Sequence, residues 1–240
     1  MLEYLKTGFV LMLITLVAGL GLSLVYNLVK EPIAQAELGA KLQAIRKVLT
    51  DPETGDLLVD EQTIPETSEE LEMFEWSAED FEVSDGIIYT SKDGKGKVQY
   101  PVYKFTTEDN RDMFVLTGDA VGYGGQVITV AGFISIDNDF NLNAIKVIEY
   151  SQETPGLGAN ISQENIQKRF YPVSNQGLRN NLKVNQDANV VISKDELEEY
   201  RDERGIIQVS DVMTGATITP RAVATSLNAM YEFLKKAGAE

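Results

Sequence analysis

Cysteine and histidine are both absent from the 240-residue sequence. Their absence excludes disulfides, thiolate and imidazole metal ligands, iron–sulfur clusters, His-ligated haem and the histidine-dependent serine and cysteine nucleophiles. If the protein carries out redox chemistry, its cofactor is therefore organic.

Positive charge is missing from one long stretch of the chain. Between Lys47 and Lys92 there is no Lys or Arg, and the fourteen acidic residues there account for most of the formal net charge of −16. These residues are Asp51, Glu53, Asp56, Asp60, Glu61, Glu66, Glu69, Glu70, Glu72, Glu75, Glu79, Asp80, Glu82 and Asp85. Such a balance provides no basic face for nucleic acid. We interpret the stretch as a solvated surface, and the alternative is a docking face for a cationic protein.

A long apolar run is present near the N-terminus, where Thr7 to Val29 form an uncharged stretch of 23 residues. A helix of this length crosses a hydrocarbon core of about 30 Å. The alternative is a cleaved signal peptide, but its apolar core is about 7–15 residues and needs a small-x-small cleavage site, which Leu24-Val25-Tyr26-Asn27 does not supply. We therefore predict a retained anchor over residues 1–31, with the lipid bilayer as the partner of residues 7–29. The charges flanking the run are balanced and leave its orientation open.

Two segments lead from the anchor to the rest of the chain. Pro32 predicts a break, and apolar residues at helical spacing from Ile33 to Leu49 predict an amphipathic connector helix over residues 32–50. Residues 51–96 are expected to contain an acidic insertion followed by the first strand, which opens at Gly86. The insertion contains Leu71, Phe74, Trp76 and Phe81, which argue against disorder throughout.

Residues 97–240 are expected to form one domain. Stretches of strand composition separated by turn residues predict an antiparallel meander over 98–106, 112–120, 126–136 and 142–150. The stretch Asp137 to Asn143 has alternating oxygen side chains like a calcium loop, but it lacks the Gly at position six and the Glu at position twelve. We predict a hairpin turn there.

Helices dominate the sequence pattern after Tyr150. We expect a helix from Ser162 to about Phe170, a strand at 189–192, a charged helix ending at Gly205, a strand at 206–209 and a last helix capped by Thr219 with Pro220 as its first residue. Strands followed by helices indicate an α+β fold, with an antiparallel sheet and flanking helices.

Small and hydroxyl-bearing residues crowd together just before the last helix, in Thr214-Gly215-Ala216-Thr217-Ile218-Thr219-Pro220. A helix start presents free backbone N–H groups and the positive end of the helix dipole, which favours a phosphate near Thr217. Arg221 is a candidate countercharge. Taken by itself, the segment favours a structural strand-to-helix turn in which Thr219 only caps the helix. A threonine nucleophile is disfavoured, since no His is available as base and Thr217 is not N-terminal.

Three motifs carry a resemblance to a known family. The segment Asp211-x-x-Thr214-Gly215-Ala216-Thr217-x-Thr219 is similar to the flavinylation motif in which a flavin transferase joins FMN through a phosphoester to the threonine after Gly-Ala. The loop Glu153-Thr154-Pro155-Gly156-Leu157-Gly158 resembles a second hallmark of the same FMN-binding domain, and Gly122-Tyr123-Gly124-Gly125 a third. With its N-terminal span, the chain resembles the G subunits of Rnf complexes (RnfG) and, as close relatives, the C subunits of sodium-translocating NADH:quinone reductases (NqrC).

The resemblance implies a set of cofactor-binding residues, with no metal and no catalytic residue. Thr217 would carry covalent FMN. The other positions implied are Asp211, Thr214, Gly215, Ala216, Ile218, Thr219, Tyr123, Glu153, Thr154, Gly156, Leu157 and Gly158. Among these, Glu153 and Thr154 would hydrogen-bond the flavin ring or ribityl chain, and Leu157 would cover a ring face.

The resemblance also implies a cellular role. The protein would be a single-pass subunit of the cytoplasmic (inner) membrane with its soluble domain on the extracytoplasmic side. Its FMN would relay electrons within an ion-translocating ferredoxin:NAD oxidoreductase, as a redox subunit that is not catalytic alone. Its partners would be the other membrane subunits and a flavin transferase. Two alternatives stay open: an NqrC-like subunit, and a stand-alone extracytoplasmic flavoprotein of another electron-transfer chain.

Overall fold

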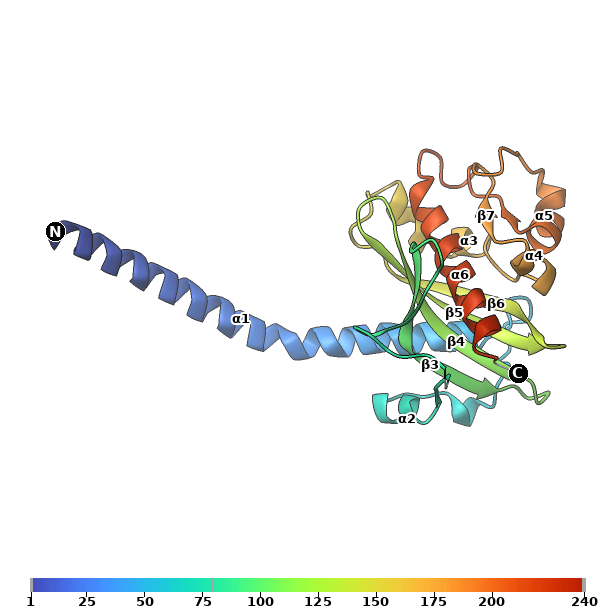
Figure 1. The fold of residues 1–240 in the computed structure, drawn as a ribbon, viewed down its shortest axis with the longest axis horizontal. Helices are drawn as coiled ribbons and strands as arrows, with labels where there is room; N and C mark the ends of the chain where they lie inside the picture. Colours follow the sequence, from blue (N-terminus) through green and yellow to red (C-terminus); the bar gives the residue numbers. More distant parts are fainter. Residues whose placement is uncertain (1, 79, 239–240) are drawn as a thin grey trace. The chain divides into compact units, whose positions relative to one another are not determined.

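The computed structural model describes residues 2–78 and 80–238, and it shows an α+β fold (Figure 1). The chain divides into two compact units, Met1–Ala40 and Lys41–Glu240. In the first unit, residues 2–40 belong to one helix, and the second unit contains the sheet and the other helices of the described residues. The predicted fold class is confirmed.

One helix, α1, runs over Leu2–Val48 and includes the whole apolar run. Its most apolar 18-residue window has a mean hydropathy of 2.4 and no buried residue, so by length and composition α1 is able to cross a membrane. The predicted break at Pro32 is wrong, because the helix continues through it. Proline removes one intrahelical hydrogen bond at a cost of about 3 kcal/mol, and the regular helical bonds on either side outweigh this local loss.

The last turns of α1 belong to the core of the second unit. Ala44, Ile45 and Val48 are at most 1% exposed. The amide Nδ2 of Asn143 donates to the carbonyl oxygens of Val48 at 2.7 Å and Thr50 at 3.0 Å. The first of these bonds satisfies a carbonyl group that the C-terminus of α1 leaves without a partner.

The sheet consists of β1 (Glu75–Trp76), β2 (Ile87–Thr90), β3 (Gly96–Thr106), β4 (Asp112–Val121), β5 (Gln126–Ile136) and β6 (Asp139–Glu149). All neighbours are antiparallel in the order β1-β3-β4-β5-β6, and β2 also pairs with β3. The predicted meander is therefore confirmed as β3 to β6. Asp137 and Asn138, at φ 47° and 61°, form the tight hairpin turn between β5 and β6.

The C-terminal half contains further helices and a second small sheet. They are α4 (Asn175–Arg179), α5 (Leu197–Arg204) and α6 (Ile218–Lys236), with a short parallel pair formed by β7 (Lys183–Val184) and β8 (Ile206–Ile207). The helix predicted over 162–170 is divided into a 3-10 turn at Gly158–Ser162 and the single turn of α3 at Glu164–Gln167. Two further short elements, η1 (Glu61–Thr63) and α2 (Ser68–Glu72), lie in the acidic stretch, and η3 (Lys194–Glu196) precedes α5.

The strand predicted at 189–192 is wrong. Asn189 has a left-handed φ of 53°, which an extended strand does not allow. The Asn185 side chain holds this segment as a loop instead, since its Nδ2 donates to the Val190 carbonyl oxygen at 3.1 Å.

The sheet is covered on both faces. Figure 1 shows α6 across its strands, and Gly118 allows this close approach, because a Cβ there would lie 2.6 Å from Cε of Met230. Gly132 faces the end of α1, where a Cβ would lie 2.8 Å from the Val48 carbonyl oxygen. The acidic stretch adds aromatic packing at one side, with Phe74 stacked on Phe105 at a centroid distance of 4.5 Å.

A buried carboxylate ties α6 and α4 to the sheet. Asp139 is 1% exposed and accepts hydrogen bonds from the Tyr231 hydroxyl at 2.8 Å and from Nε of Arg179 at 2.6 Å. Burial alone would raise the pKa of Asp139, but the bonds from Tyr231, from the Phe140 N–H and from Arg179 outweigh it and hold that pKa below its ordinary value.

Candidate functional site

Three loops converge at the N-terminal end of α6: the β4–β5 loop at 122–125, the loop at 153–158 that follows β6, and the segment 214–219. Between them lies a pocket of about 470 Å³, which we call the Thr217 pocket. Its lining residues are Tyr123, Glu153, Thr154, Leu157, Gly158, Gly215, Ala216, Thr217, Ile218 and Thr219. The three motifs singled out in the sequence thus come together at one place.

Thr217 is the residue at which α6 begins. It occupies the N-cap position with φ −99° and ψ −32°, and its side chain makes no capping hydrogen bond. The first N–H groups of a helix have no partner within the helix, so Ile218 and Thr219 present theirs at this end of α6. Gly215, at φ 80°, makes the turn into the cap, a conformation that favours glycine. The Thr217 hydroxyl therefore lies in a pocket at the positive end of a 19-residue helix.

Thr219 does not have the capping role predicted for it. It is the second helical residue, is 1% exposed, and its hydroxyl donates to Oε2 of Glu153. The cap moves to Thr217 because the helix starts at Ile218, two residues before Pro220. Pro220 still lies in the first turn, where its missing N–H costs nothing.

Glu153 joins the three loops. The residue is 3% exposed, Oε1 accepts from the Gly124 N–H at 3.1 Å, and Oε2 accepts from the Thr219 hydroxyl. A carboxylate removed from water needs such donors, because leaving it unpaired is costly. Gly122 and Gly158 make room for it, since a Cβ on either would lie 2.2 Å from a Glu153 oxygen. Glu153 thus fixes the walls of the pocket.

The outer walls of the Thr217 pocket are apolar. Tyr123 is 72% exposed, Leu157 43% and Ile218 40%. Exposed large apolar side chains grouped around one pocket indicate a binding surface. They suit a flat aromatic ligand.

Three predicted site residues do not line the pocket. The carboxylate of Asp211 accepts a hydrogen bond from Nη2 of Arg169 at 2.9 Å, so it braces the segment before the site. Thr214 is exposed and its hydroxyl donates to the Ser210 carbonyl oxygen at 3.3 Å. Gly156 lies in an exposed turn at φ 74°.

Arg221, the candidate countercharge, turns away from Thr217. Its guanidinium donates to both oxygens of Asp187, with Nε 2.7 Å from Oδ2. This pair lowers the pKa of Asp187, with the Arg221 hydrogen bond as the main cause. No spacing in the sequence could have shown the pair, because its members are 34 residues apart.

The residues of the Thr217 pocket fit FMN. Its volume of about 470 Å³ lies within the range of small-molecule sites, and its apolar walls suit the flavin ring. A hydroxyl and a helix N-terminus stand where a phosphate would bind. No Lys or Arg is among the described residues that line it. A freely dissociating phosphate would thus lack a side-chain countercharge.

The comparisons with known proteins agree with this fit. The family model for the FMN-binding domain matches residues 122–232. No curated protein matches the chain. Among solved structures, the chain is 40% identical to a protein from Thermotoga maritima assigned as an RnfG subunit of an electron transport complex, with a TM-score of 0.61. The match covers 82% of this chain and 97% of that one.

Proposed function

The chain belongs to the FMN-binding-domain family that includes RnfG subunits of electron transport complexes, and we propose that it carries FMN covalently on Thr217. The observation that carries this proposal is the position of Thr217. Its side chain makes no capping bond and lies at the start of α6, in a pocket whose described lining holds no cationic side chain. A phosphoester to Thr217 retains the phosphate without a countercharge and leaves it one negative charge fewer.

The neighbouring side chains bind and orient the flavin. Tyr123, Leu157 and Ile218 provide apolar contact for the ring, and Thr154 lines the same pocket with a hydroxyl. When bound, FMN supplies the one- and two-electron chemistry that the side chains lack. Glu153 acts indirectly, because both of its oxygens already accept hydrogen bonds from the chain itself.

Attachment requires a second protein. The Thr217 oxygen would bond to the phosphorus of an activated FMN, such as FAD, with AMP leaving and the hydroxyl proton passing to a base. The pocket offers no suitable base: Glu153 is engaged at both oxygens, and Tyr123 is the other titratable residue among the described lining. A flavin transferase would supply the base and the activated donor.

The proposed cellular role follows from the anchor and the family. α1 would hold the protein in the cytoplasmic (inner) membrane through residues 7–29, with the FMN-binding domain on the extracytoplasmic side. The flavin would relay electrons among membrane subunits of an Rnf-type ferredoxin:NAD oxidoreductase whose turnover moves Na⁺ or H⁺. In this role the chain is a redox subunit of an enzyme complex.

The attachment is tested with the full chain in detergent, expressed with and without a flavin transferase. Flavin fluorescence of the denatured band should require the transferase and should persist in Thr217→Ser, which keeps a hydroxyl. Thr217→Val has nearly the same shape without the hydroxyl and should give a dark band, whereas the matched variant Thr214→Val should stay fluorescent. A fluorescent Thr217→Val band would reject the assignment. Co-purification from native membranes tests the role, since capture of iron–sulfur and other flavin subunits supports the complex and isolation as a single chain contradicts it.

A further inference from the structure

Glu153 brings a negative charge into the Thr217 pocket. The residue lines the pocket and is 3% exposed. Both of its oxygens accept hydrogen bonds, Oε1 from the Gly124 N–H at 3.1 Å and Oε2 from the Thr219 hydroxyl, and this is the bonding pattern of an ionised carboxylate. Because these donors are neutral groups, they satisfy the oxygens without cancelling the charge.

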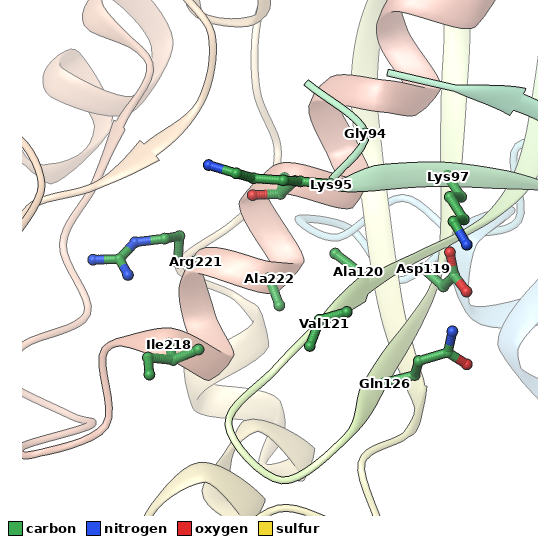
Figure 2. Close-up of a pocket in the computed structure, with 11 residues that line it drawn as sticks. Gly94, Lys95, Lys97, Asp119, Ala120, Val121, Gln126, Ile218, Arg221 and Ala222 are labelled. Carbon is green, nitrogen blue, oxygen red and sulfur yellow. The ribbon is translucent and has the colours of Figure 1, made fainter. Parts of the chain in front are cut away.

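Cationic side chains lie instead in a neighbouring pocket of about 300 Å³, which meets the Thr217 pocket at Ile218 (Figure 2). The cations that line this neighbouring pocket are Lys95, Lys97 and Arg221. Lys95 is exposed, and its Nζ lies 4.0 Å from Oδ2 of Asp93. Water and this carboxylate therefore screen its charge.

The other two cations are matched by carboxylates of their own. Arg221 extends outward from α6, and its Nε donates to Oδ2 of Asp187 at 2.7 Å (Figure 2). Lys97 is the cross-strand partner of Asp119, and its charge acts against the rise that burial causes in the pKa of Asp119. Both side chains project from the sheet face opposite α6, because the adjacent Gly96 is the residue that contacts α6. Neither cation is free to neutralise Glu153.

The N-terminus of α6 contributes about half a unit of positive charge at the pocket. The phosphoester on Thr217, on which this inference rests as part of the proposed function, would place a full negative charge at that end of the helix. Phosphate and Glu153 together exceed the charge of the helix end. A flavin ring bound in the Thr217 pocket therefore lies in a negative potential.

We propose that Glu153 lowers the reduction potential of the flavin by opposing negative charge on the reduced ring. Two electrons from a redox partner enter the ring together with one proton or with two. With one proton the reduced ring keeps a negative charge, which the Glu153 carboxylate disfavours. With two protons the reduced ring is neutral and the carboxylate has little effect. Glu153 thus acts through its charge, and it favours reduction that takes up two protons.

The dimensions of the pocket give the size of the effect. A sphere of about 470 Å³ is about 10 Å across, and two unit charges at that separation and an effective dielectric constant of about 20 change an equilibrium constant about tenfold. For a two-electron couple, a tenfold change corresponds to about 30 mV. Removing the charge of Glu153 should raise the potential by this amount wherever the reduced ring is anionic.

The test is a reductive titration of the full-length flavinylated chain in detergent, followed by flavin absorbance at a series of pH values. Glu153→Gln keeps the shape of the side chain without its charge, so its potential should lie about 30 mV above wild type at alkaline pH, and the gap should close as pH falls. Glu149→Gln is the matched control, since Glu149 accepts from the Ser151 N–H at 2.8 Å and does not line the pocket. The control should titrate like wild type, and equal potentials in wild type and Glu153→Gln overturn the proposal.

A second variant separates charge from packing. Glu153→Asp keeps the charge but shortens the side chain, so it should retain the low potential of wild type. A rise as large as that of Glu153→Gln, or a gap that does not change with pH, would assign the effect to packing and overturn the proposal. Should Glu153→Gln not fold, Thr219→Val replaces it. This change leaves the carboxylate with one donor fewer, so the alkaline potential should fall below wild type, and an unchanged potential overturns the proposal.

Failure of the proposed function would show itself separately. A wild-type band that stays dark after denaturation would reject covalent attachment, and Glu153 would then be tested with free FMN. Glu153→Gln should lower the ratio of the Kd of reduced FMN to the Kd of oxidised FMN about tenfold at alkaline pH. An unchanged ratio, or no binding at all, would count against the role of Glu153.

Discussion

Replacing Thr219 with valine removes a hydroxyl from a residue that is 1% exposed while keeping the shape of its side chain. The change deprives Oε2 of Glu153 of its donor, although Oε1 keeps the Gly124 N–H at 3.1 Å. A hydrogen bond to a charged group contributes about 1.5–3 kcal/mol, so we expect Thr219→Val to lower the free energy of unfolding by about 2 kcal/mol. For a domain of this size the melting temperature should fall by roughly 4–8 °C.

The neighbouring threonines of the same motif are the matched controls. Thr214 is exposed, and its hydroxyl bond to Ser210 spans 3.3 Å, so Thr214→Val should cost no more than about 0.5 kcal/mol. Thr217→Val should leave stability equally unchanged, because no capping bond is lost, but it should abolish flavin attachment. The three variants therefore separate a structural threonine from the attachment threonine.

Unfolding can be followed through Trp76, the single tryptophan, whose ring lies 5.1 Å from that of Phe114 in the second unit. Its fluorescence reports on the domain while α1 stays in detergent. If Thr219→Val proves as stable as Thr214→Val, the bond to Glu153 does not hold the site together and the reasoning is refuted.

Three further variants probe the frame of the site. The pKa of Asp139 is lowered in the folded state, so its contribution to stability is present above the unfolded pKa of about 3.9 and is lost as pH falls through the folded value. The difference in unfolding free energy between wild type and Asp139→Asn, measured by urea titration, should therefore shrink over that acid range. A difference that stays constant with pH would contradict this linkage. Gly158→Ala places a methyl group 2.2 Å from a Glu153 oxygen and should lower the free energy of unfolding, measured by thermal unfolding, by about 1–3 kcal/mol. Unchanged stability would mean that the loop shifts to accommodate the methyl group without cost. Arg221→Gln breaks a partly exposed pair with Asp187 and should cost under about 1 kcal/mol with flavin attachment intact on gels, whereas loss of attachment would restore Arg221 as a phosphate partner.

The sheet was accessible to sequence reasoning because its information is local. Each of β3 to β6 has strand composition, and the turns between them contain residues that favour tight reversals, such as Asp137 and Asn138. The helix start near Thr217 was visible for the same reason. The short elements after Tyr150 were harder to predict, because side chains such as Asn185 hold the chain in loops that the periodicity of the sequence does not reveal.

Long-range contacts explain the remaining errors. The capping role was given to Thr219 because a threonine before proline is a good local signal, yet Glu153, 66 residues away, takes its hydroxyl. Arg221 was likewise bound by a distant carboxylate.

Peptide mass mapping of the full chain, expressed with a flavin transferase, tests the central claim most directly. The account predicts an added mass of FMN less one water, with fragment ions that place it on Thr217. A modification on the exposed Thr214, on another residue, or on none under conditions where the transferase is active would contradict it.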